Sequence, residues 1–270
     1  NAKTGFKREP WDYDNKYLFS MVYRYDGVSS LAPDNRWGFF PGMSAGWNVH
    51  REKFFQNSSI SNVISTVKPR ISYGVNGNVA GIGDYEVQGV YGAQGNYNGS
   101  LGFLNTSIIN SGLRWEKSTQ TDLGLDVGIL NNKITLLFDY YNRETSDLLT
   151  NLTLPSYVGF GSIRTNLGTF QNKGFEITAN ANILKTKSGL TLDAGANISF
   201  VKNKILELPF NGNENNRQGG FQIYDAAQGK VMWVSGLQEG QPLGAIYAYK
   251  QLSIFQDAAE VVKIANNRYD

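Results

Sequence analysis

The sequence predicts an all-β fold, a transmembrane antiparallel up-and-down β-barrel, from three observations. Seven stretches alternate apolar and polar residues with period two for ten or more positions. Successive side chains of a strand point to opposite faces, so each stretch has one apolar, aromatic face and one polar face. Strands of soluble sheets usually run about 5–6 residues, whereas a tilted membrane-spanning strand needs roughly 9–11. Short and long connections also alternate along the chain, as they do in outer-membrane barrels.

The predicted strands follow one another with consistent facing. They are 13–25, 36–50, 66–76, 118–130, 134–143, 170–183 and 190–200, with 244–252 as a weaker eighth. Asn131-Asn132 forms a tight turn, because Asn tolerates the left-handed backbone of a two-residue hairpin. The parity of the apolar residues flips across this turn, as a hairpin requires. Pro69 cannot donate to a ladder, so we expect a bulge or a locally unpaired position there.

The connections between the predicted strands fall into two groups. The short ones are 131–132 and 185–189, and the long ones are 77–114, 144–165 and 202–242. Outer-membrane barrels place short turns on the periplasmic side and long loops outside. By this rule the long connections and 27–35 are extracellular, whereas 51–63 is periplasmic and is expected to contain a helical turn. Loops of about 20–40 residues usually indicate function.

The predicted inward faces are polar and decide the size of the barrel. The candidate lumen-lining residues are Arg24, Arg70, Asp122, Asp126, Asp139, Arg143, Glu176 and Asp193. Small eight-stranded barrels pack their interiors with side chains, whereas larger ones enclose water or a plug. We therefore expect seven or eight strands of a larger barrel. No signal peptide or closing strand is recognisable, so both ends of the chain are expected to be cuts.

The composition argues against several other function classes. The net charge is only +2 and no basic stripe is present, so we expect no nucleic-acid partner. The chain has no cysteine and one histidine, His50, which excludes disulfides, thiol catalysis and multi-histidine metal sites. Inward carboxylates could form an acid–base pair. Because they recur with interleaved Arg and Lys, we favour lumenal salt bridges or plug contacts, and we predict no enzyme, no cofactor and no metal.

Aromatic residues in the long predicted loops are the candidate substrate-binding residues. They are Tyr85, Tyr91, Tyr97, Phe103, Tyr157, Phe160, Phe221, Tyr224 and Trp233. A ring can stack on the apolar face of a sugar while nearby Asn and Asp bond its hydroxyls. The alternative is that the rings pack together or anchor a partner protein. The outward aromatics are interpreted as an interfacial girdle: Trp11, Tyr13, Trp37, Trp47, Tyr73 and Tyr140.

Five segments, in order, cover nearly the whole chain with long and specific motifs. They are YDNKYLFSMVYRYDGVSSLAPDNRWGFFPGMSAGWNVHREKFF, KPRISYGVNGN, LRWEKSTQTDLGLDVGILNNKITLLFDYYNRETSDLLTNLTLPSYVGFGSIRTNLGTFQNKGFEITANANI, ANISFVKNKILEL and EGQPLGAIYAYK. These segments resemble the SusC/RagA family of TonB-dependent outer-membrane transporters.

The resemblance implies a fold and an activity. Family members resemble barrels of about 22 strands with a plug domain inside. Residues 1–270 would form one partial β-barrel domain from the C-terminal half, without the signal peptide, the TonB-contacting segment or the plug. The whole protein would be a multi-pass protein in the outer-membrane lipid of a bacterial cell. It would import oligosaccharides or peptides, driven through TonB, with a SusD-like surface lipoprotein as a lid.

Two alternatives stay open from the residues. A SusC-like barrel could serve as a structural or assembly platform for surface proteins, with import lost. A plug and a TonB-contacting segment in the full-length sequence would favour import over this platform. The least favoured alternative is a self-contained eight-stranded barrel acting as an adhesin, which requires that these residues refold alone. The sequence does not name the cargo.

Overall fold

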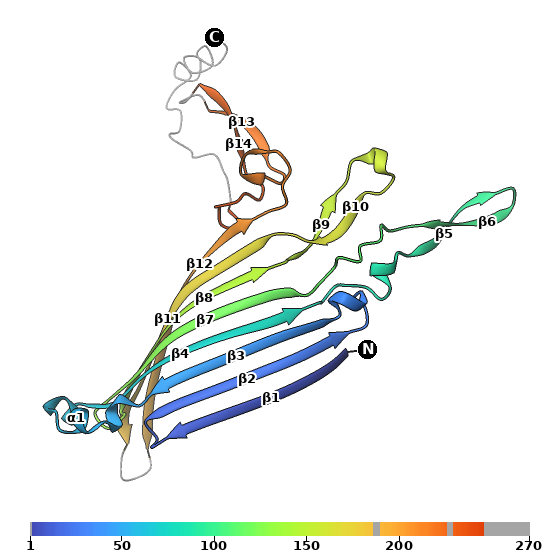
Figure 1. The fold of residues 1–270 in the computed structure, drawn as a ribbon. Helices are drawn as coiled ribbons and strands as arrows, with labels where there is room; N and C mark the ends of the chain where they lie inside the picture. Colours follow the sequence, from blue (N-terminus) through green and yellow to red (C-terminus); the bar gives the residue numbers. More distant parts are fainter. Residues whose placement is uncertain (1, 186–189, 226–228, 246–270) are drawn as a thin grey trace, which may run out of the picture. The chain divides into compact units, whose positions relative to one another are not determined.

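One large antiparallel sheet dominates the computed structural model, which describes residues 2–185, 190–225 and 229–245 (Figure 1). Its strand order is β1-β2-β3-β4-β7-β8-β11-β12, which follows the chain and confirms the up-and-down topology. Within the described residues no ladder joins β1 to β12, so the sheet is open and both are edge strands. The open sheet contradicts the self-contained eight-stranded barrel and agrees with a part of a larger one.

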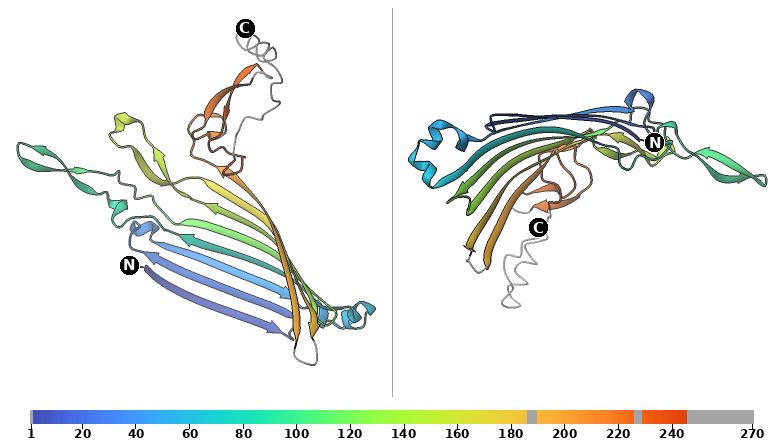
Figure 2. Two further views of the ribbon diagram at one scale, coloured as in Figure 1. Left: turned by 180° about the vertical axis from the view of Figure 1, so that it is seen from behind. Right: turned by 90° about the horizontal axis from the view of Figure 1, so that it is seen from below.

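The strands of this sheet have the length that a tilted membrane crossing needs. They are β1 Ala2–Tyr13, β2 Tyr17–Val28, β3 Trp37–Trp47, β4 Ile64–Asn78, β7 Glu116–Ile129, β8 Ile134–Ser146, β11 Thr169–Lys185 and β12 Thr191–Glu207. The shortest has 11 residues and the longest have 17. Figure 2 shows that the eight strands form one continuous, curved sheet.

Three two-stranded hairpins and several short helical turns lie in the connections. The hairpins are β5 Tyr91–Tyr97 with β6 Ser100–Asn105, β9 Leu149–Thr153 with β10 Ser162–Asn166, and β13 Phe221–Asp225 with β14 Lys230–Val234. The helical elements are α1 Lys53–Gln56, η1 Pro33–Asn35, η2 Val49–Arg51, η3 Ser59–Asn62, η4 Glu86–Gln88, η5 Ser156–Val158 and η6 Glu214–Asn216. In the described part of the chain, no helix has the length and apolarity needed to cross a membrane. The helical turn expected in 51–63 is confirmed.

The seven predicted strands are present, but several of their boundaries were wrong; the last one, predicted to end at 200, continues to Glu207 in β12. Asp14 and Asn15 take φ angles of 55° and 53°, so a turn separates β1 from β2 where one strand from 13 was predicted. The N-terminal strand β1 was missed because the charged pair Lys7 and Glu9 interrupts its apolar alternation. The second predicted strand ends at Trp47, three residues early, since the chain turns into η2. Beyond Ala245, the predicted strand 244–252 lies outside the described residues.

Two prolines limit the pairing between β3 and β4. The ladder joins only Gly42–Gly46 to Arg70–Gly74, and Pro41 and Pro69 stand immediately beyond its two ends. Proline has no backbone N–H to donate, so neither residue can extend the ladder as a donor. On its other side Pro69 pairs with Leu125 of β7 without a register shift. The unpaired position expected at Pro69 is therefore confirmed toward β3, and no bulge forms there.

The register separates the sheet into an apolar face and a polar face. Tyr17 lies opposite Trp47, and their ring centroids are 6.3 Å apart. Phe175 lies opposite Phe200 at 4.8 Å. The apolar face carries these residues together with Leu125, and its large side chains are exposed. A sheet of this kind in a soluble protein would bury that face, so its exposure fits contact with lipid.

The buried hydrophobic cluster lies at the end of the sheet from which the long connections leave. It consists of Leu31, Phe40, Val87, Leu113 and Trp115. The ring of Phe40, on the polar face of β3, meets Trp115 edge-on at 5.2 Å. A Cβ added to Gly38 or Gly77 would collide with the Phe40 ring, so these glycines leave the space that the ring occupies. This cluster, here called the rim core, folds the long connections onto the end of the sheet.

Candidate functional site

A charged network crosses three strands on the polar face, with Arg70 at its centre. Arg70 Nε donates to Asp126 Oδ1 of β7 at 3.0 Å, and its Nη2 lies 2.6 Å from Asp139 Oδ1 of β8. Gly124 stands opposite Arg70 in the register, and a Cβ there would collide with the guanidinium. The missing side chain at Gly124 is what lets one cation bridge two carboxylates on different strands.

A second hydrogen-bonded group lies on the same face, closer to the long connections. Asp122 accepts from Ser72 Oγ at 2.8 Å and from Gln120 Nε2 at 2.6 Å. Arg143 Nε donates to Gln120 Oε1 at 2.7 Å. Together with Arg70 and Asp139, this second group lines an open hollow of about 430 Å³ that also includes Asn172, Tyr141 and Glu176. The mixed charges and direct pairing fit a hydrated wall better than an acid–base pair.

The eight candidate lumen-lining residues are not all in one place. Six lie together in one band across the middle strands of the polar face, and two lie apart from it. Six share the band: Arg70, Asp122, Asp126, Asp139, Arg143 and Glu176. Arg24 Nε lies 2.6 Å from Asp26 and its guanidinium 5.4 Å from the centre of the Phe40 ring, beside the rim core. Asp193 accepts from Asn182 at 2.6 Å, where β11 and β12 approach the opposite end. All eight stand at polar-face positions of the register.

The candidate substrate-binding aromatics are spread over separate connections. Tyr91 lies opposite Asn105 and Phe103 opposite Ala93, so these two rings share one face of the β5–β6 hairpin. The rings of Tyr224 and Trp233 share one face of the β13–β14 hairpin, while Phe221 points to the other. All five side chains are exposed. Two pairs of rings thus form small aromatic surfaces, which the sequence alone did not group.

The other four candidates are single positions. Tyr85 precedes η4 with a left-handed φ of 66°, and Tyr157 is exposed on η5. Phe160 is half-buried in the β9–β10 connection. The side chain of Tyr97 lies outside the described part of the structure. Among the described side chains, the rings of Tyr85, Tyr157 and Phe160 do not pair with another aromatic ring.

Asn166 ties two long connections together. Its side chain is 7% exposed, its Oδ1 accepts from Arg114 N, and its Nδ2 donates to Arg114 O and Asp147 O, each at 2.8 Å. Arg114 also pairs with Asp147 at 2.5 Å, and this hydrogen bond raises the pKa of Arg114. Farther out, Arg164 donates to Gly81 O. The connections 79–115 and 147–168 therefore form one unit rather than two free loops.

Replacing Asn166 with Ala should release this unit. The change removes three part-buried hydrogen bonds to backbone groups of Arg114 and Asp147, which costs about 1–3 kcal/mol. Hydrogen exchange should therefore speed up in both connections, while the strands exchange as before. Asn151, an exposed residue that accepts one bond from Arg164 at 3.3 Å, is the control, and Asn151→Ala should have little effect. Unchanged exchange in Asn166→Ala would contradict the link.

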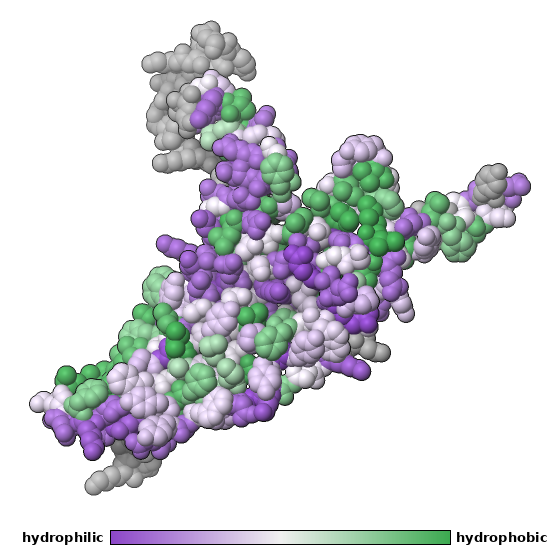
Figure 3. All heavy atoms as spheres, in the orientation of Figure 1, coloured by the Kyte–Doolittle hydropathy of each residue, from purple (hydrophilic) through white to green (hydrophobic). Residues whose placement is uncertain are grey.

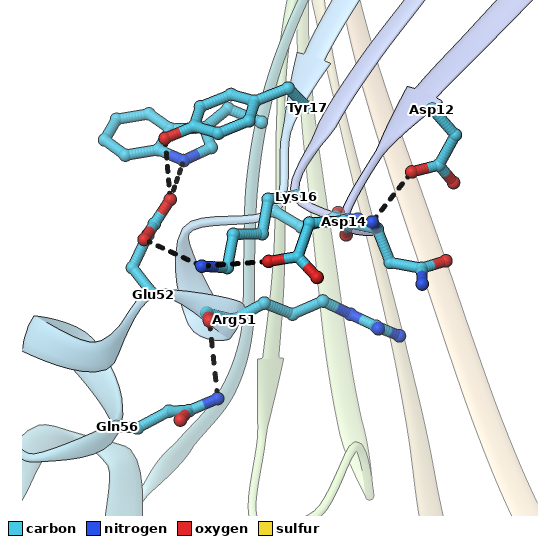
Figure 4. A network of polar contacts seen from close by, with 10 residues as sticks. Asp12, Asp14, Lys16, Tyr17, Arg51, Glu52 and Gln56 are labelled. Atoms are coloured by element: carbon cyan, nitrogen blue, oxygen red, sulfur yellow. Dashed lines mark hydrogen bonds and ion pairs between the residues drawn. The ribbon is translucent and has the colours of Figure 1, made fainter.

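At the opposite end of the sheet, Glu52 holds the β1–β2 turn (Figure 4). Its Oε1 accepts from Tyr17 Oη at 2.8 Å and from Trp47 Nε1 at 3.3 Å. Its Oε2 lies 3.5 Å from Lys16 Nζ, which also pairs with Asp14 at 3.3 Å. The hydrogen bonds from Tyr17 and Trp47 lower the pKa of Glu52, and the bond to Asp14 raises the pKa of Lys16. We call these five residues the clasp.

The clasp should weaken in acid. Because the folded pKa of Glu52 lies below its ordinary value of 4.5, its contribution is complete above that value and is lost as the pH falls through the folded pKa. Glu52→Gln removes this titration. Pepsin should cleave between Phe54 and Phe55 faster in the variant than in the native protein near pH 4.5, and the two rates should converge at lower pH. A rate ratio that stays constant with pH would contradict the role of Glu52.

Comparison with known proteins identifies the family. The profile described as "TonB dependent receptor-like, beta-barrel" matches residues 6–252, which is most of the chain. The chain belongs to the TonB-dependent receptor family. Members of this family are outer-membrane β-barrel proteins, and the family is one of transporters and receptors rather than of enzymes.

Individual relatives place the chain with receptors of SusC/RagA type. It is 35% identical over 257 residues to TonB-dependent receptor P3 of Formosa agariphila, covering 93% of this chain and 24% of the relative. It is 34% identical over 260 residues to TonB-dependent receptor SusC of Bacteroides thetaiotaomicron, covering 92% and 25%. The RagAB peptide importer in its closed-closed state matches with a TM-score of 0.71 and 26% identity, covering 88% and 25%. The chain thus spans about a quarter of the length of these relatives.

Proposed function

We propose that this chain is part of the barrel wall of a bacterial outer-membrane importer that works through TonB and a SusD-like surface lipoprotein. The proposed cargo is an oligosaccharide, with a peptide as the alternative. The observation that carries this proposal is the two-faced sheet, whose apolar face is uncovered while its polar face holds a network of charges. The plug and the TonB-contacting segment would lie in parts of the protein outside residues 1–270.

In this proposal the polar face forms part of the hydrated inner wall of the importer. Arg70 pairs with both Asp126 and Asp139, so each of these three groups has an opposite charge beside it and together they carry a net charge of only −1. Paired charges retain hydration sites but attract a passing anion or cation less than an unpaired charge would. This wall is suited to pass a neutral, hydroxyl-rich or zwitterionic cargo rather than to bind it tightly.

The β5–β6 hairpin supplies the aromatic surface proposed to meet the cargo. Tyr91 and Phe103 lie on one face and are exposed, and Asn105 stands opposite Tyr91 on the same face. Two rings beside an amide combine apolar contact with hydrogen bonding, which suits the two kinds of surface that a sugar ring presents. The likeness to the RagAB peptide importer supports a peptide cargo instead. The test must therefore include both chemistries.

The test measures binding and uptake by the full-length receptor with its surface lipoprotein. The probes are oligosaccharides from starch, fructan and mucin glycans, and a tryptic peptide digest. The double variant Tyr91→Ala/Phe103→Ala should weaken binding of the accepted cargo roughly tenfold, because an interface residue that matters costs more than about 1 kcal/mol on truncation. Leu104→Ala, on the opposite face of the same hairpin, is the matched control and should leave binding unchanged.

The outcomes separate the candidate functions. Uptake of one probe class, weakened only by the double variant, supports import and names the cargo chemistry. If all variants bind the cargo equally well, the β5–β6 hairpin is not part of the binding site. A receptor that assembles with its lipoprotein and takes up no probe would favour the assembly platform over the importer.

A further inference from the structure

The connection between β3 and β4 exposes more apolar surface than a simple periplasmic turn would. Phe54 is 63%, Ile60 55% and Val63 51% exposed, all within ten residues. Figure 3 shows hydrophobic residues gathered at the end of the sheet where α1 lies. Turns on this side of outer-membrane barrels are usually short, and exposed apolar groups that cluster usually mark a contact surface. We therefore expect another molecule to cover the apolar side chains of this connection.

The apolar face of the sheet continues directly onto α1. Tyr13 and Tyr17 have ring centroids 6.4 Å apart, Tyr17 and Trp47 are 6.3 Å apart, and Trp47 and Phe54 are 6.4 Å apart. The first three rings stand at apolar-face positions of β1, β2 and β3. Phe54 thus extends a row of aromatic rings that begins on the apolar face. The medium that covers the apolar face should therefore also contact Phe54.

The connection is fastened to the sheet at both ends. Glu52, directly before α1, accepts hydrogen bonds from Tyr17 and Trp47, as Figure 4 shows. At the other end, Leu130 N donates to Val63 O at 2.8 Å and Asn131 N to Ser65 Oγ at 2.6 Å. Glu52 therefore links two rings of the aromatic row to the helix that carries the fourth. This arrangement fixes α1 beside the row.

Two basic residues come just before Phe54 in the sequence. Arg51 and Lys53 are exposed, and within the described residues neither belongs to an ion pair. In Figure 4 the Arg51 side chain extends away from Glu52 and Tyr17, toward the side on which Asp12 lies, so Lys53 is the basic residue considered with Phe54. A basic side chain next to an exposed aromatic ring, as Lys53 is to Phe54, is typical of segments that lie in the headgroup region of a bilayer, where lipid phosphates attract the cation.

We propose that residues 51–63, here called the interfacial segment, lie on the phospholipid surface at the periplasmic side of the membrane. Phe54 would enter the boundary between headgroups and acyl chains, and Lys53 would meet lipid phosphates. This inference rests on the proposed membrane location of the sheet. A lipid surface is favoured over a periplasmic protein because the aromatic row connects Phe54 to the face that already meets lipid.

Fluorescence quenching can test whether lipid, water or protein surrounds Phe54. These residues contain no cysteine, so single cysteines carrying an environment-sensitive dye can replace Phe54, Gln56 or Leu125 in a cysteine-free full-length receptor. The receptor is placed in nanodiscs of phosphatidylethanolamine and phosphatidylglycerol. Quenchers are lipids with a doxyl group either near the headgroup, to reach Phe54, or deep in the acyl chain, to reach Leu125, and aqueous iodide. Gln56 is the matched control, because residues two apart on a helix point to nearly opposite sides.

The dye at Phe54→Cys should shift to the blue and be quenched by the doxyl lipid, since interfacial helices sink roughly 5–10 Å into the boundary region. The dye at Gln56→Cys should respond to iodide instead. Iodide quenching at Phe54, or protection there from both quenchers, would overturn the inference, and the second result would indicate cover by protein. The dye at Leu125→Cys reports separately on the wall. If lipid quenches the dye at Leu125 but not at Phe54, only the proposal for the interfacial segment is contradicted. If lipid does not quench the dye at Leu125, the proposed membrane location of the sheet is contradicted as well.

Discussion

Leu125→Arg is expected to destabilise the folded protein by about 2–4 kcal/mol, the cost of a cation on the lipid face near the middle of a bilayer. Leu125 stands on the apolar face of β7, opposite Pro69 of β4 and Phe138 of β8. Every neighbour in that row is apolar, so an arginine there has no partner in the sheet. Its guanidinium would have to reach toward a headgroup or draw water into the bilayer.

The same substitution on the polar face provides the control for Leu125→Arg. Glu176 stands opposite Asp139, so Glu176→Arg places the new cation beside a carboxylate. We expect a much smaller change, within about 1 kcal/mol, as for partly exposed charge pairs. Both variants can be compared by urea unfolding of the full-length receptor in lipid vesicles. Equal losses of stability would show that the two faces do not differ in their surroundings.

Phe40→Ala is expected to cost about 3–5 kcal/mol, as truncations of buried phenylalanines do. Phe40 is 3% exposed and is the residue of the sheet on which the rim core is built. Its loss removes the contacts with Trp115 and the Arg24 guanidinium. Gly38 and Gly77, beside it, have no side chains that could fill the cavity. The connections would then lose their anchor on β3.

Hydrogen exchange distinguishes local from global loss in Phe40→Ala. Residues 79–115 should exchange much faster, while β7 and β8 keep most of their protection. Phe40→Leu, which retains much of the volume, should show a smaller effect of the same pattern. If both variants exchange like the native protein, Phe40 does not hold the connections in place.

The alternation of the sequence predicted seven of the eight strands of the sheet, the Asn131-Asn132 turn and the two faces because these features are local. Side chains of a strand alternate whatever its partners are, so parity alone separates Leu125 from Asp126. The Asn131-Asn132 turn could be predicted for the same reason. Leu130, Asn131 and Asn132 all adopt left-handed angles, with φ of 53°, 58° and 60°. Asparagine adopts these angles more easily than most residues.

The long-range contacts could not be predicted in this way. Asn166 forms hydrogen bonds with Arg114, 52 residues away in the sequence, and no sequence pattern near Asn166 indicates this partner. The role of Gly124 depends on the two-carboxylate bridge at Arg70, which requires the register of three strands. One signal was present: Phe40 is a large apolar residue at an inward position, which a hydrated wall does not explain. Its presence indicated that something packs against the polar face at that end.

The central claim is that hydrocarbon covers one face of this sheet and water the other. The most direct measurement is a spin-label scan along β7, from Ser118 to Ile129, in the full-length receptor in lipid vesicles. Labels at odd positions should collide with oxygen, which concentrates in the bilayer, and labels at even positions with a water-soluble nickel complex. Accessibilities that do not alternate with period two, or nickel access at both Leu123 and Leu125, would contradict the claim.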